Sequence, residues 1–95
     1  MPAGDKRSSV TAAGRALAAG ISAYERKDYS IAFRRFSQAA EAGDDREALY
    51  RLGLVYAHGQ GVVANIADAL TWYRKAAERG HAQAQYQLAL AYTGP

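Results

Sequence analysis

One stretch near the middle of the chain has the spacing of a phosphate-binding loop. Residues 59–64, "GQGVVA", fit the pattern G-x-G-x-x-A, which cradles a dinucleotide when it joins a strand to a helix. The preceding segment "LGLVYAHG" returns as "LALAYTG" inside a helical pattern, and the chain is too short for a doubly wound sheet. We therefore prefer a mechanical role, in which Gly59 and Gly61 adopt positive φ angles. Nucleotide binding is kept as the alternative.

The two histidines are the other residues that could do chemistry. His58 precedes the glycine loop and His81 follows a predicted helix, and no acidic pair accompanies either of them at metal-ligand spacing. The chain has no cysteine, which excludes disulfides and thiolate metal sites. We predict a capping or solvated histidine in both cases, with no catalytic residue, no metal and no cofactor. An enzyme that uses His58 with the glycine loop is the rival hypothesis.

Basic residues recur on two of the predicted helices and could form a basic surface stripe that binds nucleic acid weakly. They are Arg34, Arg35, Arg74 and Lys75. Glu41, Asp68 and Glu78 are interleaved with them, and the formal net charge is only +3. A solvated face is the preferred interpretation, so we expect no nucleic acid among the partners.

The length and composition indicate one small helical domain. The chain has 95 residues, and proline occurs only at positions 2 and 95, which leaves the interior free of helix breakers. We find no apolar segment long enough for a signal peptide or a membrane span, so we expect a soluble protein without a membrane partner. The compartment, cytoplasmic or periplasmic, stays open. Residues 1–8 are polar and predicted to be disordered.

Two segments of the chain are nearly the same. Residues 36–56 and 72–92 both carry Ala-Ala-Glu, a glycine, an alanine, a tyrosine, two leucines and a final tyrosine, at an offset of 37 and then 36 residues. A fixed period in this range is typical of stacked helical repeats. The sequence therefore predicts an array of helix pairs.

Apolar residues at helical spacing divide the chain into five predicted helices and no strand. Their ranges are about 9–25, 28–42, 44–59, 65–80 and 82–92. Asp44 with Glu47, and Asn65, are the predicted N-terminal caps, and Gly59 and Gly80 the predicted C-terminal stops. The predicted buried stripes contain Val10, Leu17, Ile21, Tyr24, Tyr29, Ala32, Phe33, Phe36, Ala40, Ala48, Leu52, Val55, Tyr56, Ile66, Ala69, Leu70, Tyr73, Ala76, Ala77 and Tyr92.

Short motifs in these helices resemble known repeats. Leu52-Gly53-x-x-Tyr56 and Ala32-x-x-x-Phe36 are similar to the tetratricopeptide consensus, and four extra residues in "GQGV" lengthen the loop as in the Sel1-like repeat. The resemblance predicts an all-α, right-handed superhelical solenoid of antiparallel helix pairs with about two and a half repeats. Residues 9–95 would form one domain, with a tetratricopeptide-like unit at 9–43, a Sel1-like unit at 44–80 and the first helix of a third unit at 81–95.

The resemblance also predicts a function. Sel1-like proteins are mostly non-catalytic adaptors, often bacterial, so we expect a protein-interaction module that binds a protein or peptide partner. In such a superhelix the first helix of each pair lines the concave surface. The predicted partner-binding residues at matching places on two first helices are Tyr50, Leu54 and Glu47, and Tyr86, Leu90 and Gln83. Partial burial of Tyr50 and Tyr86 between repeats is the alternative.

The remaining repeat residues are predicted to be structural. Gly53, with Gly20 and Ala89 as its counterparts, would let paired helices approach closely, while Trp72 and Tyr73 would pack beside and within the core. The last predicted helix lacks a mate. Its apolar residues are Tyr86, Leu88, Leu90, Ala91 and Tyr92. We expect either a homodimer through this helix or a chain that continues beyond residue 95.

Overall fold

The computed structural model describes residues 6–43 and 45–93, which form five α-helices. The helices are α1 (Lys6–Glu25), α2 (Tyr29–Gly43), α3 (Arg46–His58), α4 (Ile66–Glu78) and α5 (Ala82–Thr93). Within these ranges there is no strand. The expected all-α class and the number of helices are therefore confirmed.

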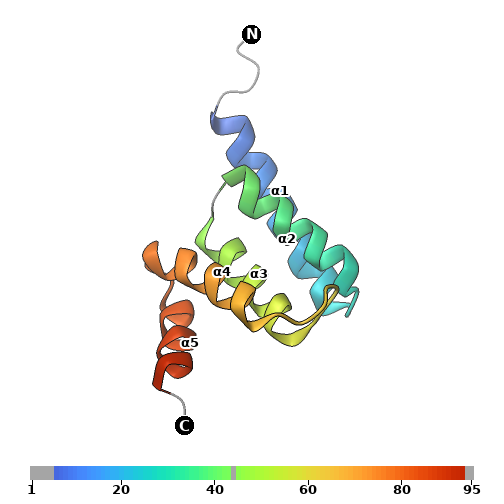
Figure 1. The fold of residues 1–95 in the computed structure, drawn as a ribbon. Helices are drawn as coiled ribbons and strands as arrows, with labels where there is room; N and C mark the ends of the chain where they lie inside the picture. The colour runs from blue at the N-terminus through green and yellow to red at the C-terminus, as the bar shows by residue number, and fades with distance from the viewer. Residues whose placement is uncertain (1–5, 44, 94–95) are drawn as a thin grey trace.

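The helices are arranged as successive pairs (Figure 1). Helix α1 packs on α2 and α3 on α4, while the α2–α3 and α4–α5 contacts join one pair to the next. The molecule is elongated, with extents of 56 × 28 × 18 Å. Each helix mainly contacts its neighbours in the sequence, as expected for a solenoid.

Local hydrogen bonds explain where the helices begin and end. Asp45 caps α3, because its Oδ1 accepts from the backbone N–H groups of Glu47 (2.8 Å) and Ala48 (3.2 Å). The prediction that Asp44 is this cap is wrong, because α3 begins at Arg46, one residue later than a cap at position 44 requires. Residue 44 itself lies outside the described residues. Asn65 caps α4 through the N–H of Asp68 at 3.0 Å.

The first helix begins at Lys6, three residues before its predicted start. Of the segment expected to be disordered, residues 6–8 are therefore helical and residues 1–5 lie outside the described residues. Helix α1 ends in a turn in which Lys27 has φ 63° and the N–H of Asp28 donates to the Ala23 carbonyl at 2.8 Å. This short turn reverses the chain into α2.

The core runs along the joined pairs and consists mostly of alanine with a few large side chains. The largest fully buried side chains are Phe36, Leu49, Leu52 and Val55. Two residues predicted to be buried are instead exposed: Ile66 is 60% and Tyr92 is 64% accessible. Ile66 is the first residue of α4, beside the exposed Val63, and Tyr92 lies near the end of α5, so each is at the margin of the helix packing. The side chain of Val10 lies outside the described part of the chain.

Both helix pairs are closed by the same kind of contact. An aromatic ring of the second helix lies against a glycine of the first: Phe36 against Gly20, and Tyr73 against Gly53. The loop between α3 and α4 then joins the two pairs. Its Gly61 lies against the backbone carbonyl of Tyr29, and its Gln60 accepts a 3.0 Å hydrogen bond from the Tyr24 hydroxyl. This loop therefore fixes the second pair on the first.

Candidate partner-binding site

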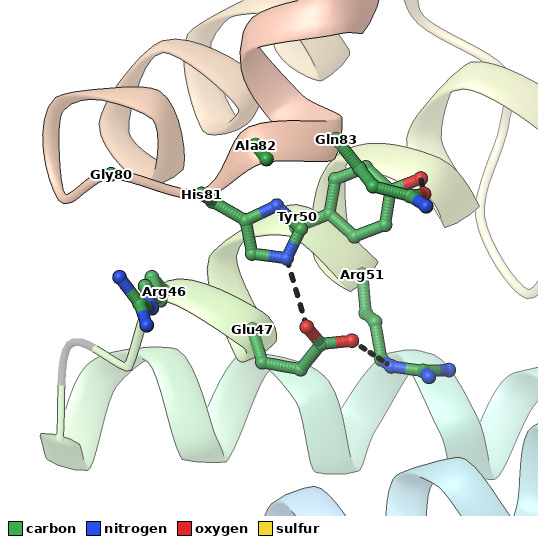
Figure 2. A pocket seen from close by; sticks show the side chains of 8 residues that line it. All are labelled: Arg46, Glu47, Tyr50, Arg51, Gly80, His81, Ala82 and Gln83. Atoms are coloured by element: carbon green, nitrogen blue, oxygen red, sulfur yellow. Dashed lines mark hydrogen bonds and ion pairs between the residues drawn. The ribbon is translucent and has the colours of Figure 1, made fainter.

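A cleft of about 510 Å³ lies between α3 and the start of α5 (Figure 2). It is lined by Arg46, Glu47, Tyr50, Arg51, Gly80, His81, Ala82 and Gln83. The first half of α3 supplies four of these side chains, and the α4–α5 turn with the first residues of α5 supplies the rest. The cleft is therefore formed where the first helices of two consecutive units meet.

Glu47 is the central charged group of the cleft. Its Oε1 lies 2.8 Å from Nε2 of His81, and its Oε2 lies 2.7 Å from Nε of Arg51, one helical turn away. Partial burial raises the pKa of the Glu47 carboxyl, but the hydrogen bonds from His81 and Arg51, together with the Arg51 charge, outweigh it. The pKa of Glu47 is therefore lowered from its ordinary value of 4.5, and the carboxylate is held in its charged form.

His81 joins the second unit to the third. Its Nδ1 accepts a 3.2 Å hydrogen bond from the N–H of Ala84, so it caps α5, and the proton on Nε2 then points at Glu47. The imidazole also stacks on the ring of Tyr50, with 4.4 Å between ring centroids. His81 is thus a capping residue built into the wall of the cleft.

The two repeat-equivalent tyrosines have different surroundings. Tyr50 is only 8% exposed, and its hydroxyl donates a 3.0 Å hydrogen bond to Oε1 of Gln83. Burial, and then the nearby Glu47 charge, raise the pKa of Tyr50. Tyr86 is 62% exposed, because no described helix covers it as α5 covers Tyr50. The same position is therefore closed in one unit and open in the next.

The structure gathers only part of the predicted partner-binding set in the cleft. Glu47, Tyr50 and Gln83 line it together. Leu54, half-buried on α3, and Tyr86 and Leu90 on α5 lie further along the same two helices, and Leu90 is 48% exposed. The predicted residues therefore divide into an ordered polar end and an open apolar end.

Sequence reasoning did not place four of the lining residues in the site, namely Arg46, Arg51, His81 and Ala82, and it predicted Gly80 only as a structural residue. One of them had a readable signal, because Arg51 follows Glu47 at the i, i+4 spacing of a helical ion pair. The approach of His81 to Glu47 spans 34 residues and had none.

The alternative sites lie elsewhere. The glycine loop has Gly59 at φ 65° and Gly61 at φ 80°, and Gly61 faces the α2 backbone; no strand precedes it within residues 6–43 and 45–93. His58 is exposed, with its Nδ1 3.0 Å from the Leu54 carbonyl oxygen. Among the described residues no group of three or more His, Asp or Glu side chains could hold a metal ion. Nor does any helix in the described ranges combine the length and the apolar content that crossing a membrane requires.

The other residues singled out earlier lie on the second helices or just after them. Gly80 has φ 86° just after α4, and the half-buried Trp72 has Nζ of Lys75 4.8 Å from its ring centroid. Tyr73 is 4% exposed, and its burial raises its pKa to about 12. The basic side chains of α2 and α4 are exposed; they are Arg34, Arg35, Arg74 and Lys75.

Replacing Glu47 by glutamine is expected to weaken the fold more at neutral pH than at acidic pH. A carboxyl whose pKa is lowered on folding stabilises the protein above its unfolded pKa and loses this contribution as pH falls through its folded pKa. Because Glu47 is partly exposed, we expect a loss below about 1 kcal/mol at pH 7, and a smaller loss at about pH 3, which lies below the unfolded pKa. Urea denaturation of wild type, Glu47→Gln and the exposed control Glu41→Gln at both pH values checks this. An equal loss at both pH values would contradict the assigned role.

Helix pairs that repeat along one axis define an α-helical repeat protein of the tetratricopeptide-like class. The family described as the Sel1 repeat matches residues 12–44, 46–81 and 82–94, so the chain belongs to the Sel1 repeat family. The match includes the first unit, whose short loop resembles a tetratricopeptide unit. Sel1 repeats typically serve as protein–protein interaction modules.

A curated relative matches most of the chain. An F-box protein of Arabidopsis thaliana is 42% identical over 72 residues, which cover 76% of this chain and 20% of the relative. The chain thus spans about a fifth of the length of that protein. Since the relative is a plant protein, the expectation of a bacterial source gains no support from it.

Proposed function

We propose that this chain is a non-catalytic interaction module that binds a peptide segment of a partner protein along α3 and α5. The observation that carries the proposal is the position of the cleft between the first helices of two consecutive units, with Tyr86 and Leu90 exposed further along α5. By family resemblance, these first helices line the concave face. The typical role of Sel1 repeats, and a similar segment in an F-box protein, support a protein partner.

The two ends of this surface would contribute to the binding energy in different ways. At the polar end Glu47, Tyr50 and His81 are held by hydrogen bonds and stacking, so little side-chain entropy is lost when a peptide binds there. At the apolar end Tyr86 and Leu90 are open to solvent, and a partner side chain would bury them. Tyr86 is therefore the expected centre of the binding energy.

We expect Tyr86→Ala to weaken peptide binding at least about tenfold while the fold survives, because loss of a central aromatic contact costs more than about 1.4 kcal/mol. Peptides selected by panning a random octapeptide library on the immobilised chain would be titrated by calorimetry and mapped by amide shifts. The control Ile66→Ala removes an equally exposed apolar side chain at the start of α4 (60% against 62%). Shifts confined to α2 and α4, or equal effects of the two variants, would contradict the proposal.

We further propose that α5 pairs with α5 of a second copy. Gly20 and Gly53 are buried under a ring of their partner helix, but Ala89, at the matching position of α5, is exposed with Tyr92 close by in the sequence. Helix α5 carries no charged residue, so two antiparallel copies would not repel each other.

Sedimentation velocity over a range of concentrations is expected to show a dimer. Ala89→Arg should shift the protein to monomer, because the long charged side chain would lie in the paired face. The control Ala67→Arg, at an exposed position of α4, should leave the dimer unchanged. A wild-type monomer at the highest concentration would contradict this pairing.

A further inference from the structure

Building on the proposed function, we infer that the bound segment places a carboxylate beside the arginines that line the α3–α5 cleft and an apolar side chain on Tyr86 and Leu90. The ligand class is thus an extended acidic–apolar peptide motif. The inference depends on the charges that line the cleft and on the order of side chains along α5.

Most of the side-chain donors left free in the cleft belong to Arg46 and Arg51, and the amide Nε2 of Gln83 is a neutral one beside them. Both carboxylate oxygens of Glu47 are already engaged, one by His81 and the other by Arg51. Arg51 uses only Nε for this contact, and its two outer nitrogens have no protein partner within the described residues. Arg46 gives one nitrogen to the Arg79 carbonyl oxygen at 3.1 Å. The two arginines lie on opposite sides of Glu47 (Figure 2), and the free outer nitrogens of Arg51 are the donors best suited to pair with a carboxylate.

The electrostatic field at the start of α5 also favours an anion in the cleft. The cleft lies at the first turns of α3 and α5. The Asp45 carboxylate already meets the positive end of α3, whereas α5 has no acidic residue in its first turn and is capped by His81, so its positive end is not neutralised. The two guanidinium groups outnumber the one carboxylate in the lining. An acidic group there would meet positive potential on several sides.

The apolar end fixes the spacing of the motif. Along α5, Tyr86 is three residues and Leu90 seven residues beyond Gln83, or about 4.5 Å and 10.5 Å along the helix axis. An extended peptide advances about 3.3 Å per residue. With Gln83, which lines the cleft together with the two arginines, as the reference point, the apolar side chain should follow or precede the acidic one by about one to three residues.

A nucleic acid is the less favoured occupant. Its phosphates continue along the strand, whereas α5 beyond the cleft has no basic residue and exposes glutamine, alanine, leucine and tyrosine. The Glu47 carboxylate also lies inside the cleft and would repel a second phosphate. A peptide needs only one acidic group there.

The test pans one random octapeptide library in parallel on wild type, on Arg46→Gln/Arg51→Gln and on the matched control Arg34→Gln/Arg35→Gln, whose exposed arginines lie on α2. Wild type and control are expected to select Asp or Glu one to three residues from an aromatic or aliphatic residue. The cleft variant should lose the acidic preference and keep the apolar one. Changing Asp to Asn in the best wild-type peptide should weaken binding to wild type about tenfold, and to the cleft variant less than about twofold.

Measurements on the wild-type chain alone keep the test independent of any variant that folds poorly. The ratio of the affinities for the Asp and Asn peptides should shrink as the sodium chloride concentration is raised, because the contact is between charges. Equal affinity of both peptides, with amide shifts on α3 and α5, would overturn the acidic motif and leave the proposed function standing. Selection of no peptide, or shifts only outside α3 and α5, would overturn both. Tighter binding of an oligothymidylate than of the selected peptide would overturn the motif in favour of nucleic acid.

Discussion

Gly53→Leu is expected to lower the free energy of unfolding by about 1–3 kcal/mol, because the added side chain would overfill the contact that closes the second helix pair. Even a Cβ atom at this position would lie 2.6 Å from Cδ1 and Cε1 of Tyr73 and 3.2 Å from the Ala69 carbonyl oxygen. The Tyr73 ring cannot yield easily, since it is 4% exposed and lies near Tyr50, with 5.7 Å between ring centroids. Helix α4 would have to move away from α3.

The chain provides a matched control for this substitution at Gly14. That glycine also lies within a helix, but a Cβ atom there would meet nothing within 4 Å. Gly14→Leu is therefore expected to stabilise the protein by roughly 0.5–1 kcal/mol, through the better helix propensity of leucine. Urea denaturation followed by circular dichroism measures both effects. A Gly53→Leu protein with the midpoint of wild type would show that the two helices do not need this close approach.

Gly61→Ala is expected to destabilise the protein by roughly 2–4 kcal/mol, from the strained backbone together with a steric clash. Gly61 has φ 80°, which side-chain-bearing residues rarely adopt. A Cβ atom there would overlap the carbonyl oxygen of Tyr29, at the first residue of α2. The obstacle is backbone, so the loop itself would have to lift off the first helix pair.

Gly80→Ala separates these two causes, because Gly80 has a similar φ of 86°. Its added Cβ would meet only Nη1 of Arg46, at 3.3 Å, which is the end of a flexible side chain. We expect Gly80→Ala to cost roughly 1 kcal/mol, close to the penalty for positive φ alone. Equal losses of stability in the two variants would mean that the contact between the loop and α2 contributes nothing to the free energy of unfolding.

A lifted loop should also loosen the junction between the first two units. Besides Gly61, the junction contains the Tyr24–Gln60 hydrogen bond and the edge-to-face pair of Phe33 and Tyr56, with 5.5 Å between ring centroids. In a solenoid, stability depends on such contacts between neighbours as well as on each unit. Gly61→Ala should therefore make unfolding less cooperative, which would appear as a lower m-value in urea.

The helices and the small-residue contacts were readable from the sequence because they depend on local or repeated patterns. Asn65 caps α4 through a residue three positions away, and the apolar period of each helix needs only its own side chains. The recurrence of a small residue predicted the close approach of paired helices, which the structure shows at Gly20 and Gly53, whereas Ala89 at the matching position of α5 is exposed. The Sel1 family was likewise readable from the leucine-glycine-tyrosine spacing and the long loop.

The environment of the site was decided by tertiary structure alone. Tyr50 and Tyr86 occupy the same repeat position, yet one is buried beneath α5 and the other is exposed, because only the first has a following unit over it in the described chain. The link from His81 to Glu47 joins two helix starts that are 34 residues apart, and no periodicity specifies which side chains meet there. A repeated sequence determines the unit, whereas the stacking of units decides which of its faces stay open.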